Sequence, residues 1–153
     1  MEVKLSVVGI EQIDDLIKGL PTVFQHSVLQ NAHAEAAKPL IYKEHLLAPV
    51  GETGKTADSI GLIKPPFSKA SVSGEVQAGP RRGKFGGNVA HLSEFGTKPR
   101  FNKSGAYRGI MPKHPFVTPA WEQTHSEVED KIAVALSQKL LVFMKKTIKN
   151  ANG

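Results

Sequence analysis

The segment GETGKT (51–56) contains residue types that hold a nucleotide phosphate in other proteins. A phosphate-binding loop has the pattern Gly-x-x-x-x-Gly-Lys-Ser/Thr and lies between a strand and a helix. Here Pro49 occupies the first glycine position, and proline has no amide hydrogen to donate to a phosphate. The preceding residues are predicted to be helical. We therefore expect no nucleotide site and interpret 51–56 as a polar loop, in which Thr53 or Thr56 caps the following turn.

Histidines and acids in the second half of the chain are the next candidates, as metal ligands or catalytic groups. His91 and Glu94 lie three residues apart, and His114 and His125 follow at longer intervals. No two of these histidines have the spacing of a helical zinc site or a zinc finger. The chain has no cysteine and no Gly-x-Ser-x-Gly motif. We therefore expect no catalytic residues, no metal, no cofactor and no enzyme activity, and we interpret Glu94 as a strand-end carboxylate paired with a lysine or arginine.

Hydrophobic periodicity predicts an α+β fold in one domain over 1–153, with about four antiparallel strands, two N-terminal helices and one long C-terminal helix. Pro39 removes a backbone donor, so a kink or restart is expected there. The last helix should bury Trp121, Val128, Ile132, Leu136, Leu140 and Phe143. The predicted elements are a strand at 2–8, helices at 10–20 and 21–47, a loop at 50–57, a hairpin of strands 60–64 and 70–78, a short strand or turn at 89–95, and a helix at about 116–150.

That last helix would be roughly 50 Å long at about 1.5 Å per residue, which is more than so small a body covers. Part of it is therefore expected to pack on a neighbouring subunit. No apolar run approaches the length of a membrane span, and acids stand where a secretory signal is apolar. We expect a protein that is made in the cytoplasm, is used without export and has no membrane partner.

Positive charge is concentrated in the middle of the chain. Between Pro80 and Lys113 there are eight basic residues and one acid, Glu94, so this segment carries +7 while the whole chain carries +6. Such a field favours an anionic partner. The candidate contact residues, in loops expected to be mobile near 79–88 and 97–113, are Arg81, Arg82, Lys84, Lys98, Arg100, Phe101, Lys103, Tyr107, Arg108 and Lys113.

The loop at 97–113 has no periodicity, five positive charges and no acid. Ordering 17 residues costs more conformational free energy than burial of its few large apolar side chains can return. It is therefore either a solvated flap or an arm that becomes ordered on a partner. Its length and its aromatic residues favour an arm.

Three patches together resemble the head–tail joining, or tail-completion, proteins of long-tailed double-stranded DNA phages. They are APVGETGKTADSI (48–60), VAHLSEFGT (89–97) and HPFVTPAWE (114–122). Gly51-Glu52 lengthens the first patch by one residue, and Ala57 replaces a usual leucine. The matching positions, interpreted mainly as structural, are Thr53, Gly54, Ser59, Ile60, His91, Glu94, Phe95, Gly96, Thr97, Pro115, Phe116, Pro119 and Ala120. Gly96 is expected to permit a turn, Phe95 and Phe116 to fill the core, and Pro119 to lie in the first turn of a helix.

The resemblance implies a structural virion protein at the head–tail junction. Copies would form a homo-oligomeric ring, expected to be a hexamer, that completes or terminates the tail tube. Its partners would be the tail tube protein, a head-connector or stopper protein, and DNA in the lumen through non-specific contact. The alternative from the residues alone is a small basic nucleic-acid-binding module, because Phe85, Phe101 and Tyr107 alternate with cations.

Overall fold

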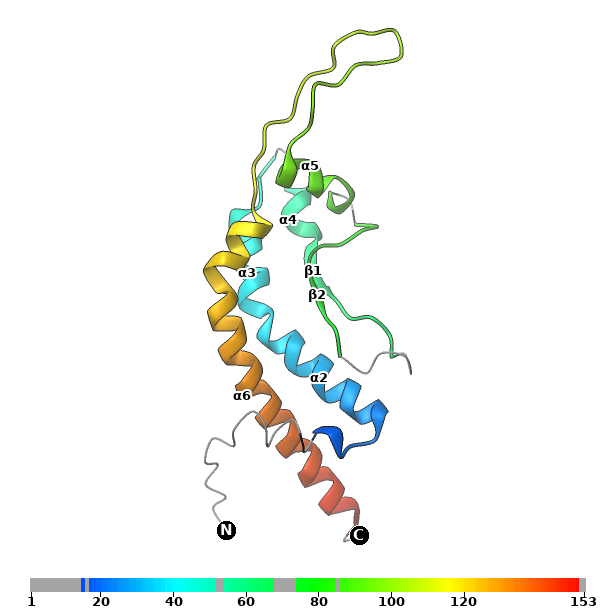
Figure 1. The fold of residues 1–153 in the computed structure, drawn as a ribbon, viewed down its shortest axis with the longest axis vertical. Coiled ribbons are helices and arrows are strands. Elements are labelled where there is room, and N and C mark those ends of the chain that lie inside the picture. The colour runs from blue at the N-terminus through cyan, green and yellow to red at the C-terminus, as the bar shows by residue number, and fades with distance from the viewer. Residues whose placement is uncertain (1–14, 16, 52–53, 68–73, 85, 152–153) are drawn as a thin grey trace. The chain divides into compact units, whose positions relative to one another are not determined.

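The computed structural model describes the chain except for residues 1–14, 16, 52–53, 68–73, 85 and 152–153, and it describes only the backbone of 147–151. Helices and a small antiparallel sheet are mixed along the chain (Figure 1). The chain divides into two compact units. Unit 1 comprises Met1–Ala36, Lys64–Val76 and Glu129–Gly153, and unit 2 comprises Ala37–Ile63 and Gln77–Val128.

The predicted helix at 21–47 is broken into α2 (Thr22–Ala36) and α3 (Lys38–Leu47). Ala37 separates them, and Pro39 lies in the first turn of α3. Proline is tolerated in a first turn because the amides there have no intrahelical acceptor. The expected restart near Pro39 is confirmed. The predicted helix at 10–20 lies largely outside the described residues.

Unit 1 is built around apolar side chains of α2 and the second part of α6 (Val117–Ala151). Ile17, Val28 and Leu140 are buried together. Phe24 of α2 stacks on Phe143 of α6 with ring centroids 5.1 Å apart. These contacts give unit 1 a small core of its own.

Unit 2 contains the sheet, in which β1 (Ile60–Ile63) pairs antiparallel with β2 (Gln77–Pro80). Ile60 lies opposite Pro80, and Ile63 lies opposite Gln77. The predicted hairpin is therefore present, but its second strand begins later than expected. The structure describes two strands where about four were predicted; the predicted strand at 2–8 lies outside the described residues.

The predicted strand or turn at 89–95 is wrong in part. This segment forms a 3-10 turn (Gly87–Val89) followed by the helix α5 (Ala90–Phe95). Its buried residues are Ala90, Ser93 and Glu94, whose spacing of three and four is helical. Because two of the three are polar, the apolar pattern alone did not indicate a helix. The predicted loop at 50–57 also ends earlier, since α4 (Lys55–Ser59) begins within it.

The long last helix is confirmed as α6, with 35 residues. Val128 and Leu140 are buried as predicted, but Trp121 is 46% exposed. The buried face in unit 2 instead follows Ala120, Thr124 and Val128, at intervals of four, and Trp121 is turned away from it. No helix of the described residues is both long and apolar enough to cross a membrane.

Candidate functional site

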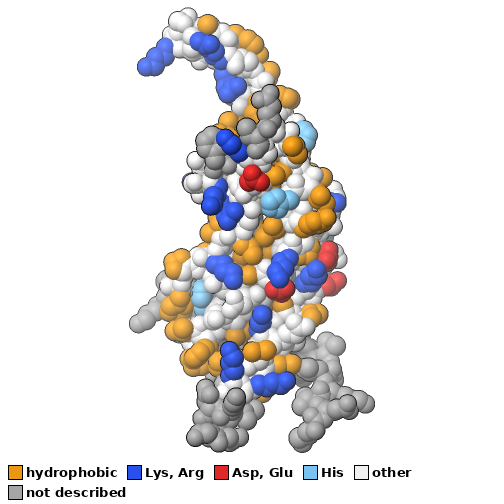
Figure 2. All heavy atoms as spheres, turned by 180° about the vertical axis from the view of Figure 1, so that it is seen from behind, with side chains coloured by type: hydrophobic (Ala, Val, Ile, Leu, Met, Phe, Trp, Pro, Cys, Tyr) orange, Lys and Arg blue, Asp and Glu red, His pale blue; other side chains and the backbone are white. Residues whose placement is uncertain are grey.

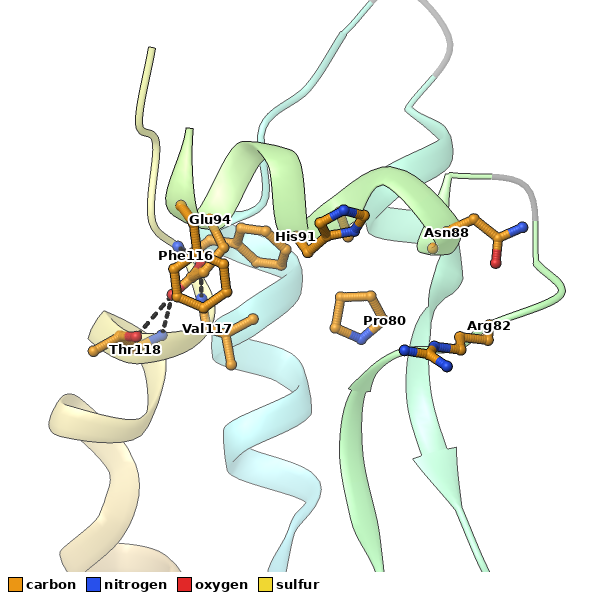
Figure 3. A pocket seen from close by; sticks show the side chains of 11 residues that line it. Pro80, Arg82, Asn88, His91, Glu94, Phe116, Val117 and Thr118 are labelled. Carbon is orange, nitrogen blue, oxygen red and sulfur yellow. Dashed lines mark hydrogen bonds between the residues drawn. The ribbon is translucent and has the colours of Figure 1, made fainter. Parts of the chain in front are cut away.

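Glu94 of unit 2 has a buried carboxylate that caps the N-terminus of α6 (Figure 3). Its Oε2 accepts hydrogen bonds from the backbone N–H of Phe116 at 2.7 Å and of Val117 at 3.0 Å. Its Oε1 accepts from Thr118, from the backbone N–H at 3.0 Å and the hydroxyl at 2.7 Å. The first amides of a helix have no intrahelical acceptor, so this carboxylate satisfies three of them from another helix.

These four bonds correct the interpretation of Glu94 as a strand-end carboxylate paired with a cation. The side chain is 5% exposed. Burial by itself raises the pKa of its carboxyl, but the hydrogen bonds from Phe116, Thr118 and Val117 outweigh burial and lower the pKa. Glu94 is therefore ionised at neutral pH, where a negative charge also suits the helix N-terminus.

The three sequence patches meet around this cap. Ala48 and Ile60 come from the first patch, Ala90 from the second and Phe116 from the third, and they form one buried cluster. Phe116 is fully buried, as expected, and Ile60 is 3% exposed. Segments almost 70 residues apart in sequence thus share one core, which explains why these positions are apolar.

The remaining positions of the first patch shape its turn. Gly54 has a φ of 59° and precedes α4. Ser59 is fully buried, and its hydroxyl donates to the carbonyl of Thr56 at 2.7 Å. Thr53 lies outside the described residues. Gly54 and Ser59 therefore shape the backbone that leads into β1.

In the second patch, Phe95 contradicts the expectation. It is 72% exposed and does not fill the core. Gly96 has a φ of 71° and permits the turn that was predicted for it. Thr97 exchanges two hydrogen bonds with Met111: its backbone N–H donates to the Met111 carbonyl at 3.0 Å, and its Oγ1 accepts from the Met111 N–H at 2.9 Å. Gly96 and Thr97 therefore form the base of the following segment.

The third patch opens α6. Pro115 is exposed just before the helix, whereas Ala120 is fully buried on its inner face. Pro119 is the third residue of α6 and lies in its first turn, as expected. The patch therefore sets where α6 begins and which face it buries.

A cavity of about 450 Å³ lies beside the cap. Figure 3 shows Glu94 and Phe116 on one side of it, and Pro80, His91 and Arg82 on the other. Both carboxylate oxygens of Glu94 are engaged by the helix amides. Within the described part of the chain no cluster of three histidine or acidic side chains is able to hold a metal ion.

The three cations of the turn after β2 differ in role. The Arg81 Nε donates to the carbonyl of Ser59 at 3.0 Å, and the guanidinium packs over Gly61. Arg81 is half-buried and ties the turn to β1, whereas Arg82 and Lys84 are exposed. Of the three, Arg82 and Lys84 leave their charge in solvent.

Residues 97–113, which we call the arm, form a narrow antiparallel ladder where sequence alone predicted a loop. The backbone N–H of Arg100 donates to the Gly109 carbonyl at 3.0 Å, and Asn102 pairs with Ala106 at the tip. Phe101 bridges to Tyr107, and their rings pack edge to face at 5.7 Å. The arm extends from the end of α5 and returns to the start of α6 (Figure 1). Its mobility stays a prediction.

The arm presents the predicted contact residues to solvent. Phe101 is 61% exposed, Tyr107 58% and Ile110 55%. Figure 2 shows lysine and arginine side chains on the arm beside apolar ones, with no acidic side chain among them. An exposed surface that mixes aromatic residues with cations is typical of a protein or nucleic-acid contact. The cations, all exposed, are Lys98, Arg100, Lys103, Arg108 and Lys113.

Glu44 of α3 is a functional candidate that the sequence patterns missed. Its side chain is fully buried, and neither carboxylate oxygen has a hydrogen-bond partner among the described residues. Burial, and then the charge of Glu94, raise the pKa of Glu44 to about 7. The sequence did contain a signal for this burial. Glu44 follows Ala36 and Leu40 at intervals of four, along the face of the helix that was predicted to be buried.

Comparisons of the chain with protein-family models, with curated proteins and with solved structures found no match.

Proposed function

We propose that this protein is a structural subunit of the phage neck, which assembles with copies of itself into a ring that completes the tail tube and joins it to the head connector. One observation carries the proposal: the three patches that resemble tail-completion proteins converge on a single core cluster and one helix cap. This convergence agrees with the mainly structural role that the resemblance implies for these positions, and it is what supports the proposal.

The exposed surface supports assembly as the mode of action. Phe95, Phe101 and Tyr107 are each more than half exposed. Burial of such side chains on a partner releases about 1.5–3 kcal/mol each, which is the usual driving force of association. Polar side chains of unit 2 that have a defined role, such as Glu94 and Arg81, serve its own backbone. The exposed aromatic side chains and the polar side chains that bond the backbone are thus separate groups, as expected of an assembly protein.

The proposed ring is a hexamer in the virion, at the head–tail junction. One face would meet the tail tube protein and the other the head-connector or stopper protein. DNA would pass through the lumen, where exposed cations such as Arg82 and Lys84 make non-specific contacts with phosphates. This role does not require the protein to recognise a base sequence.

Electron microscopy of the purified protein, alone and mixed with purified tail tubes, tests this function. We expect closed rings, or rings seated at tube ends. A protein that forms no rings and never decorates tubes at any concentration would contradict the proposal.

A nucleic-acid-binding module is the second candidate, favoured by the five exposed cations and two aromatic rings of the arm. Phosphate contacts release counterions, so tight binding would weaken steeply with salt. Titration of the protein with duplex and single-stranded DNA at several salt concentrations separates the two functions. Tight, salt-sensitive binding by a protein that never assembles would favour the module.

A further inference from the structure

We propose that the arm of one copy binds the first part of α6 of a second copy, so that adjacent subunits are joined head to tail. The proposal rests on the proposed function for its partner, a second copy of this chain. It adds which two surfaces meet and why they are complementary. Both surfaces lie within unit 2.

The arm is the cationic and aromatic side of the contact. Its 17 residues carry five lysines and arginines and no acid. Phe101 and Tyr107 stack on each other near its end, and both remain more than half exposed. At about 3.3 Å per residue, each half of the arm is long enough to reach roughly 25 Å from its base.

The first part of α6 is the acidic and aromatic side. Residues 117–128 contain Glu122 and Glu127 and no lysine or arginine, and the sequence continues with Glu129-Asp130. Trp121 is 46% exposed, and its ring lies 5.9 Å from the ring of His125. Glu122 and His125 are exposed beside it. At about 3.6 residues per turn, Glu122 and His125 share a face with Trp121, whereas Glu127 lies roughly 120° round the helix from it. The face therefore combines apolar area with the negative charge of Glu122, and it contains no lysine or arginine, which matches the arm in both respects.

The arm of a subunit is badly placed to cover this face on the same subunit. It rejoins the fold at His114, whose backbone N–H donates to Ser93, directly before α6 begins. From there the arm and the first part of α6 extend in different directions (Figure 1). A second copy is therefore the natural occupant. Because the two surfaces differ, the contact is heterologous, and repetition of such a contact closes a ring when the rotation allows.

Nucleic acid would also attract the arm. It would leave without a role the exposed side chains of Trp121, Glu122 and His125, which we call the Trp121 face. Phosphates repel Glu122, so DNA cannot bridge the two surfaces. A protein partner that offers a carboxylate beside an aromatic ring accounts for both surfaces together. We therefore favour the second copy, and the experiment below distinguishes it from DNA.

A charge-swap experiment tests the contact. The arm variant carries Arg100→Glu with Arg108→Glu, the helix variant carries Glu122→Arg, and a third protein carries all three changes. A matched control, Lys145→Glu with Lys146→Glu, changes the net charge by as much as the arm variant does, at exposed positions of α6 far along the helix from Trp121. Oligomer mass is measured by sedimentation velocity, and circular dichroism verifies that each variant is folded.

The arm variant and the helix variant should each assemble roughly tenfold more weakly than the wild type, because attraction between the arm and Glu122 becomes repulsion. The protein with all three changes should recover part of the loss, and the control should assemble like the wild type. Unchanged assembly of the arm variant would overturn the contact while leaving the ring intact. Retained assembly with lost DNA binding would also overturn it. A wild type that never assembles would instead overturn the proposed function, and the contact with it.

Cross-linking provides a second measurement that does not depend on charge. Because the chain has no cysteine, Tyr107→Cys and His125→Cys place single thiols on the two surfaces. A mixture of the two variants, treated with a short bis-maleimide, should yield a cross-linked pair, whereas each variant alone should yield little. Equal cross-linking of Tyr107→Cys with itself would indicate a symmetric contact and overturn the head-to-tail arrangement.

Discussion

Glu94 and Glu44 are both buried carboxylates of unit 2, yet their surroundings move their pKa values in opposite directions. Glu94 accepts four hydrogen bonds from the start of α6, and its pKa is lowered despite burial. Glu44 has no hydrogen-bond partner among the described residues, and burial raises its pKa to about 7. One charge stabilises unit 2 and the other destabilises it, which gives two tests at the scale of single residues.

Removal of the cap by Glu94→Ala should lower the free energy of unfolding by about 2–4 kcal/mol, because one buried and two partly buried amides lose a charged acceptor. Urea denaturation measures the change, with Asp58→Asn as the control, since that carboxylate is exposed in the same unit and should matter by less than about 0.5 kcal/mol. A lowered pKa stabilises the fold above the ordinary pKa of 4.5, so the Glu94 effect should fade as pH falls below that value. An unchanged unfolding midpoint at pH 7 would contradict the cap.

Neutralisation of the buried charge by Glu44→Gln should stabilise the protein at pH 8 by about 3 kcal/mol and change little at pH 5. The folded-state pKa of about 7 lies above the ordinary 4.5, so wild-type stability is lost as pH rises from 4.5 through 7. The size follows from about 1.4 kcal/mol per pKa unit. The measurement is the difference in unfolding free energy between variant and wild type at pH 5, 6, 7 and 8. A difference that does not grow with pH would show that Glu44 is solvated or paired.

At the scale of elements, the base of the arm depends on Gly96. Its φ is 71°, and a Cβ there would lie 3.1 Å from the Met111 carbonyl and the Lys113 nitrogen. Gly105 at the arm tip also has a positive φ, 80°, but nothing lies within 4 Å of its added Cβ. The two glycines therefore share backbone strain and differ in crowding.

Gly96→Ala should accelerate amide hydrogen exchange at Thr97 and Arg100, whose N–H groups form the ladder at the base, by roughly tenfold, because strain and crowding act together. Gly105→Ala should affect only the turn around Asn102, since strain acts there alone at about 1–2 kcal/mol. Equal exchange rates at Thr97 in the two variants would show that crowding at the base has no effect.

The sequence predicted elements well where the local chemistry was decisive. The break near Pro39 follows from a missing donor, and the start of α6 at 117 lies one residue from the prediction. The helix at 90–95 was missed because its buried face is mostly polar, and a polar residue counts as exposed in an apolar pattern. The role of Glu94 was missed for a related reason: its partners are backbone amides 22 residues away, which no spacing in the sequence reveals.

At the scale of the molecule, the role of the candidate interface residues stays a prediction, and the structure shows only which of them are exposed. Arg81 proved to be tied to Ser59, whereas Phe95, expected in the core, is exposed beside the cavity. The placement of each depends on tertiary contacts between distant segments. The need for a partner stays a prediction from the sequence, and the structure adds that Phe101, Tyr107 and Trp121 are exposed to solvent.

The mass of the wild-type protein in solution, measured by sedimentation velocity over a wide concentration range, tests the central claim most directly. The claim is that neighbouring copies cover the arm and the Trp121 face. The account predicts a concentration-dependent rise from the 16.6 kDa protomer to one closed multiple of that mass, expected to be six. A protein that stays at the protomer mass throughout the range, with no association with tail tubes, would contradict it.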